Sequence, residues 1–119
     1  MLHEIRHSLN RLIETGESSV IDLRSIPLAP GEEEKILTAL GRGELRAELD
    51  ALGKSEIIET QYAGVWLISH YNENEEIIGR FIEVTVMPDI LCSQSADMID
   101  ASQRLAEALQ DTGGNNEGG

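Results

Sequence analysis

The sequence predicts an α+β fold: a mixed, mainly antiparallel sheet of about five strands with helices packed on it, in the order α-β-α-β-β-β-β-α. Apolar residues recur at helical spacing in three segments, one at the start of the chain, one after the first strand-like run and one near the end. Strand-like runs fill the centre, and short tracts rich in glycine or asparagine separate them. With 119 residues, the chain has the length of one domain.

The first helix is expected over residues 2–15. Gly16 supplies its C-terminal stop, and the apolar residues recur three or four apart at Leu2, Ile5, Leu9, Leu12 and Ile13. A strand over residues 19–23 follows, where the pattern alternates toward β. Residues 26–31 contain two prolines and a glycine and break regular structure.

A second helix is expected over about residues 31–40. Three glutamates in its first turn favour the positive end of the helix dipole, and Gly41 follows its last leucine. Residues 44–50 then alternate between charged and apolar side chains, which is typical of a half-buried strand.

Three further strands are predicted over residues 55–61, 65–71 and 76–87. The polar tract at 72–75 is a turn, and Pro88 ends the last strand. The four central strands therefore form an antiparallel meander, to which the strand at 19–23 is added at a place that the sequence leaves open.

The last helix is expected to begin near Ser95, with one apolar face formed by Met98, Ala101, Leu105, Ala108 and Leu109. We expect a single domain over residues 1–110. The tail at 111–119 contains no large apolar side chain and is expected to be disordered.

Charge and composition exclude several classes of function. The chain has 22 Asp and Glu against 9 Lys and Arg, a formal net charge of −13, which repels nucleic acids and anionic membranes. No apolar run approaches the roughly 20 residues that span a bilayer. A single cysteine, Cys92, allows neither an internal disulfide nor a cysteine-based metal site, and is expected to be a half-buried, inert thiol. A soluble protein of the reducing cytoplasm fits these features.

One catalytic motif is present. His3-Glu4-Ile5-Arg6-His7 matches H-E-x-x-H on a predicted helix, where His3 and His7 lie one turn apart and could hold zinc with Glu4 as general base. No second signature marks a third ligand, and the motif begins too early for a preceding sheet edge to form a substrate cleft. We therefore predict no metal site, and keep a small zinc-dependent hydrolase as the alternative.

No other chemistry is indicated by the residues. Gly41-Arg42-Gly43 lacks the Lys-Ser/Thr of a phosphate loop. His70 has Ser69 and Tyr71 as neighbours, but adjacent strand residues point to opposite faces, so no catalytic pair follows. We predict no catalytic residue and no cofactor, and hence no enzyme.

Two apolar sheet faces are the clearest sign of an interaction surface. On the strand at 65–71, Trp66, Ile68 and His70 share one face, and Val65, Leu67 and Tyr71 the other. Either the three helices cover both faces, or one face is a homodimer or partner surface. In the second case Trp66, Ile68 and His70 are the partner-contact candidates, with Trp66 as the anchor.

Several separate segments, in order along the chain, carry a family resemblance. They are Leu2–His7, Val20–Ser25, Glu48–Gly53, Glu59–Trp66, Ile82–Val84 and Val86–Leu91. Together they closely resemble the C-terminal domain of the HupH/HyaF family of nickel–iron hydrogenase expression proteins, over about residues 2–109. The resemblance implies an accessory, chaperone-like protein that binds a hydrogenase subunit precursor or another maturation factor, with no cofactor of its own.

Overall fold

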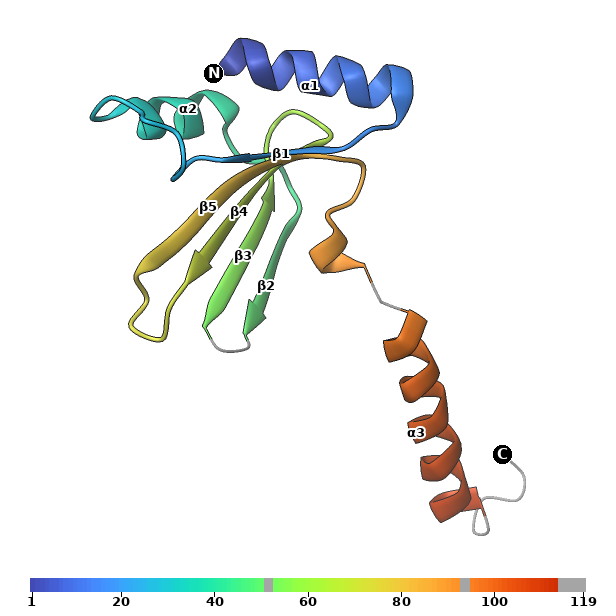
Figure 1. The fold of residues 1–119 in the computed structure, drawn as a ribbon. Helices are drawn as coiled ribbons and strands as arrows, with labels where there is room; N and C mark the ends of the chain where they lie inside the picture. Colours follow the sequence, from blue (N-terminus) through green and yellow to red (C-terminus); the bar gives the residue numbers. More distant parts are fainter. Residues whose placement is uncertain (51–52, 93–94, 114–119) are drawn as a thin grey trace. The chain divides into compact units, whose positions relative to one another are not determined.

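The computed structural model describes residues 1–50, 53–92 and 95–113. It divides into two compact units, Met1–Pro88 and Asp89–Gly119, where the sequence predicts a single domain over residues 1–110. The first unit holds a sheet and two helices, and the second holds a short 3-10 helix and the last helix (Figure 1).

The first unit is built on a five-stranded sheet. The strands are β1 (Ser19–Asp22), β2 (Arg46–Asp50), β3 (Lys54–Glu59), β4 (Val65–Tyr71) and β5 (Ile77–Val84). Their spatial order is β1-β5-β4-β3-β2, and all neighbours are antiparallel. The α+β fold and the four-strand meander are thus confirmed. The strand whose place was open, β1, pairs with β5, which leaves β1 and β2 as the two edges.

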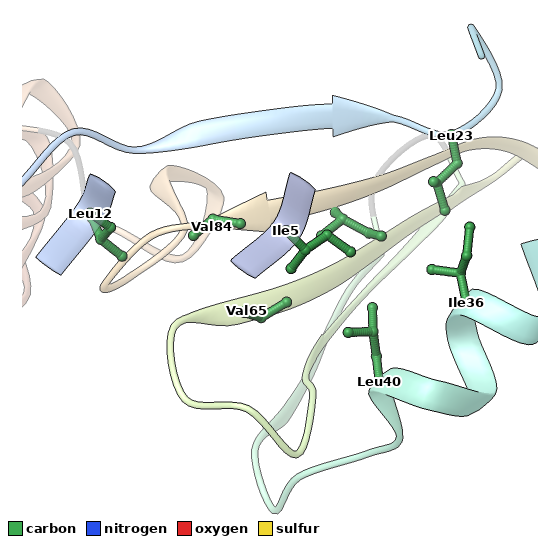
Figure 2. Packing of buried hydrophobic residues seen from close by; sticks show 8 residues of the cluster. Ile5, Leu12, Leu23, Ile36, Leu40, Val65 and Val84 are labelled. Carbon is green, nitrogen blue, oxygen red and sulfur yellow. The ribbon is translucent and has the colours of Figure 1, made fainter. Parts of the chain in front are cut away.

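Two helices, α1 (Leu2–Thr15) and α2 (Glu32–Leu40), pack on the same face of this sheet, which we call the helix face (Figure 1). Gly16 ends α1 in the left-handed conformation, with φ 77°, and its N–H donates to the Leu12 carbonyl. The core on this face joins buried residues of both helices to the sheet: Ile5, Leu12, Leu23, Ile36, Leu40, Val65, Ile82 and Val84 (Figure 2).

The alternation of strand residues places a second apolar set on the opposite face. The register aligns Phe81 of β5, Ile68 of β4 and Ile57 of β3 across three neighbouring strands. Ile57 and Ile68 are buried and Phe81 is half-buried. Both faces are therefore apolar, as the sequence predicts, and α1 and α2 lie on only one of them.

The second unit contains η1 (Asp89–Leu91), a short helix absent from the elements that the sequence predicts, and α3 (Ser95–Gly113). The apolar side chains Met98, Leu105 and Leu109 are 54–65% exposed. The helix runs three residues beyond Gln110, and residues 114–119 of the predicted disordered tail lie outside the described residues. None of the helices in the described part of the chain combines the length and the apolar composition that a bilayer crossing requires.

The expectation for Cys92 was wrong. The thiol is exposed, not half-buried, because the residue follows η1 at a turn in which its N–H donates to the Asp89 carbonyl at 2.9 Å.

Candidate interaction site

An apolar pocket of about 430 Å³ opens between α1 and α2. It is lined by residues of α1, α2, the β3–β4 turn and the start of β4: Leu2, Ile5, Arg6, Leu9, Asn10, Ala39, Leu40, Tyr62 and Val65. Concave, mostly apolar sites with a few polar groups are the usual places where proteins take a ligand or a partner side chain.

The helical spacing of α1 explains which residues reach this pocket. Leu2, Ile5 and Leu9 recur on one side of the helix, so the stripe that enters the core with Ile5 continues into the pocket. Leu2 is 47% exposed, as expected for a residue at the pocket mouth and not in the core.

Hydrogen bonds fix the far wall of the pocket. The Gln61 side chain donates to the Ala39 carbonyl at 3.0 Å, and its backbone N–H donates to the Leu40 carbonyl at 3.0 Å. These bonds tie the β3–β4 turn to the C-terminus of α2, and so place Tyr62, which is 49% exposed, beside the pocket. The wall is held in place before a partner binds, which lowers the entropic cost of binding.

The charge at the pocket is basic within an acidic protein. Arg6 is the charged residue of the lining, and it has no ion-pair partner among the residues that the structure describes. The pocket therefore suits an apolar side chain with an acidic or polar neighbour.

The structure places the three predicted partner-contact residues on one face, as expected, but in different surroundings. Trp66 and Ile68 are 3% and 4% exposed, and His70 is half-buried. The Trp66 indole N–H donates to the Thr85 carbonyl at 3.1 Å. Trp66 and Ile68 are thus packed side chains in this structure, and their role in partner contact stays a prediction.

His70 has a partner that sequence reasoning missed. Its Nδ1 lies 2.7 Å from the hydroxyl of Ser55 on β3, and its ring meets Phe81 edge-on with centroids 5.7 Å apart. Ser55 faces His70 directly in the β3–β4 register. In a catalytic serine–histidine pair the other ring nitrogen, Nε2, holds the serine while Nδ1 is oriented by a carboxylate, so this contact fits a structural role.

The H-E-x-x-H motif lies on α1 as predicted. His3 and His7 are both exposed, one turn apart in the first half of the helix. Within the described residues, no group of three His, Cys, Asp or Glu side chains is placed to hold a metal ion.

Beyond the core, the helix face becomes charged. Arg80 of β5 donates to Glu33 of α2 at 3.0 Å and to Ser69 of β4 at 3.2 Å, and its side chain is only 12% exposed. This contact links α2 to the middle of the sheet, where partial burial strengthens an ion pair relative to a surface one.

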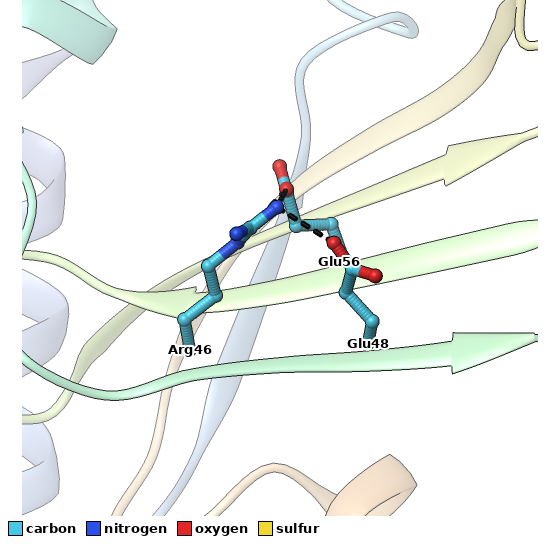
Figure 3. Close-up of polar contacts among 3 residues, drawn as sticks. All are labelled: Arg46, Glu48 and Glu56. Carbon is cyan, nitrogen blue, oxygen red and sulfur yellow. Dashed lines mark hydrogen bonds and ion pairs between the residues drawn. The ribbon is translucent and has the colours of Figure 1, made fainter.

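A second ion-pair cluster lies at the β2 edge (Figure 3). Arg46 donates to Glu56 through two guanidinium nitrogens and to Glu48 at 2.7 Å. Hydrogen bonding and attraction from Glu56, with a further attraction from Glu48, raise the pKa of Arg46 above its ordinary value. Arg46 is thereby held over two strands, β2 and β3.

Comparison with known proteins gives a family match over almost the whole chain. The model of the HupH hydrogenase expression protein, C-terminal conserved region, matches residues 1–112. The hydrogenase expression/formation protein HoxQ of Azotobacter vinelandii is 26% identical over 87 residues, which is 73% of this chain and 31% of that protein. HupH of Rhodobacter capsulatus is 28% identical over 95 residues, which is 80% of this chain and 34% of that protein. The chain thus spans about a third of the length of these curated relatives.

A solved structure is similar along nearly its full length. The hydrogenase expression protein HupH from Thiobacillus denitrificans is 40% identical, with a TM-score of 0.87, and the match covers 92% of each chain.

Proposed function

This chain belongs to the family of the HupH hydrogenase expression protein, C-terminal conserved region, and from that membership we propose that it is an accessory protein of nickel–iron hydrogenase maturation. It binds an immature hydrogenase subunit or another maturation factor in the cytoplasm. It shields or positions this client by transient contact, without covalent chemistry. The relatives that support this role are named hydrogenase expression/formation proteins.

The observation that carries the binding role is the pocket between α1 and α2. It offers a client an apolar cavity of about 430 Å³ on a fixed wall. An exposed apolar side chain of an incompletely folded client gains about 25 cal/mol for each Å² that it buries there. Arg6 selects segments in which an acidic residue stands close to that side chain.

This assignment makes Leu2 the most informative position to change. We expect Leu2→Asp to reduce capture of hydrogenase precursors at least several-fold, because it places a carboxylate at the mouth of an apolar pocket. The measurement is affinity capture from cells that are assembling a hydrogenase, with the captured precursor identified and quantified by mass spectrometry.

Ile13→Asp is the matched control. Ile13 lies on the same helix and is 73% exposed, but it does not line the pocket. It should leave capture unchanged, and both variants should melt within a few degrees of the parent. Equal capture by the Leu2 variant and the parent would remove the pocket from the proposal. Failure of the parent to capture any hydrogenase precursor or maturation factor would remove the function itself.

The alternative, a zinc-dependent hydrolase, rests on the spacing of His3 and His7 on α1. We expect the purified protein, after incubation with zinc and dialysis, to retain much less than one equivalent, because two exposed histidines complete only half of a tetrahedral site. Elemental analysis provides the measurement. A full equivalent of zinc that disappears in the double variant His3→Ala/His7→Ala would support the hydrolase instead.

A further inference from the structure

The edge strand β2 presents an ordered row of backbone groups on its outer side. Among the described residues, β2 pairs with β3 alone. The Glu59 N–H donates to the Leu45 carbonyl at 3.0 Å, which makes odd-numbered residues of β2 the ones that bond to β3. The N–H and C=O groups of Arg46, Glu48 and Asp50 therefore point away from the sheet.

The side chains along this edge divide by face. Arg46, Glu48 and Asp50 lie on the helix face, whereas Leu45, Ala47 and Leu49 lie on the opposite face. Leu45 and Leu49 are 56% and 39% exposed. The edge thus carries charge on one side and exposed apolar surface on the other, in a strand without a proline to block pairing.

We propose that β2 is a self-association edge that pairs antiparallel with β2 of a second copy, centred on Glu48. In this register all five residues of the strand are paired. Residues whose backbone N–H and C=O groups point outward stand opposite residues of the same kind in the second copy, as an antiparallel ladder requires. Two-fold symmetry makes every contact between different residues occur twice, which is the usual geometry of a homodimer. The inference goes beyond the proposed function, because it concerns a second copy of the chain and not a client.

The sequence of β2 is complementary to itself in this register. Arg46 stands opposite Asp50 of the second copy, so opposite charges face each other at both ends. On the other face Ala47 stands opposite Leu49 of the second copy, a small side chain against a large one. Only Glu48 meets its own copy, and the Arg46 guanidinium, 2.7 Å from the Glu48 carboxylate, offsets that repulsion.

A single strand pair makes a small interface, so covalent trapping is the suitable test. In a Cys92→Ser background, Ala47→Cys and Leu49→Cys are prepared separately and then mixed in a glutathione redox buffer. These positions face each other as a non-hydrogen-bonded pair, whose Cα separation of about 4.5 Å suits a disulfide. We expect the mixture to give about tenfold more cross-linked dimer than either variant alone.

A proline substitution supplies the control for the backbone. Glu48→Pro removes an outward N–H and leaves the bonds to β3 intact, so it should abolish the cross-link while the circular dichroism spectrum and melting temperature stay close to those of the parent. If Glu48→Pro does not fold, Asp50→Pro makes the same test, because Asp50 is the next residue of β2 whose N–H points away from β3.

Three results would overturn the proposal. One is equal cross-linking of the mixture and of the separate variants. Another is cross-linking of Ala47→Cys alone, which would place the two-fold axis at Ala47. The third is unchanged cross-linking in the folded proline variant. Precursor capture by the Glu48→Pro variant is measured alongside: retained capture keeps the proposed function intact whatever the cross-linking shows.

Discussion

Replacing Ile82 by alanine is expected to lower the free energy of unfolding by about 2–5 kcal/mol. Ile82 is fully buried at the centre of the helix face, where it stands between Ile21 of β1 and Leu67 of β4 and belongs to the same cluster as Ile5 of α1. Deleting three carbons there removes apolar burial and leaves a cavity that two helices and three strands cannot easily close. Urea denaturation of the variant and the parent measures the difference.

Ile78→Ala is the matched control for this experiment. Ile78 lies on the same strand and is 63% exposed, so its loss should change the free energy of unfolding by no more than about 0.5 kcal/mol. Ile82→Val should fall between the two, at about 0.5–1.5 kcal/mol. Similar losses for Ile82→Ala and Ile78→Ala would show that the helix face is not the core that stabilises the first unit.

Much of this fold could be predicted because its signals are local. The apolar spacing of α1 and the stop at Gly16 place that helix at Leu2–Thr15, as predicted. Period-two alternation assigned Trp66 and Val65 to opposite faces, and the register of β4 with β5 confirms that assignment. Strand ends were less well predicted: pairing stops at Val84, because β1 begins at Ser19 and β4 at Val65, so no partner strand continues beside residues 85–87.

Non-local features could not be read from the sequence. Alternation gives the faces of a strand but not its neighbours, so the place of β1 beside β5 stayed open. The contact between Ser55 and His70 depends on the β3–β4 register, which only the hairpin geometry fixes. Only a prediction of the β3–β4 hairpin that included its register would have placed Ser55 opposite His70.

The candidate site shows the same division. The stripe Leu2, Ile5 and Leu9 was predicted as the packing face of a helix, and Ile5 does enter the core. Leu2 instead remains half exposed at the mouth of the pocket, because α2 and the β3–β4 turn stop short of covering it. The position of such a gap depends on how far apart the two helices lie on the sheet. The apolar spacing within each helix does not determine that distance.

Trp66→Glu is expected to have the largest effect of any single substitution considered, and to unfold the first unit. Trp66 is 3% exposed and bonded through its indole N–H to the Thr85 carbonyl, so the change removes a large apolar side chain and leaves a buried acceptor without its donor. In addition, the register places Glu59 and Glu83 directly beside position 66 on the two neighbouring strands. A third carboxylate between them adds like-charge repulsion to the lost packing.

Trp66→Lys separates these two causes, because it loses the same packing but puts a cation between the two glutamates. We expect it to be destabilised less than Trp66→Glu, and Tyr62→Glu, which changes a half-exposed aromatic residue, to be destabilised least. Thermal melts followed by circular dichroism compare the three variants. A Trp66→Glu protein that stays folded and monomeric but loses precursor capture would contradict the core role. A folded variant would mean that the fold does not need the Trp66 side chain. The loss of capture would then make the face that carries Trp66, Ile68 and His70 the client surface.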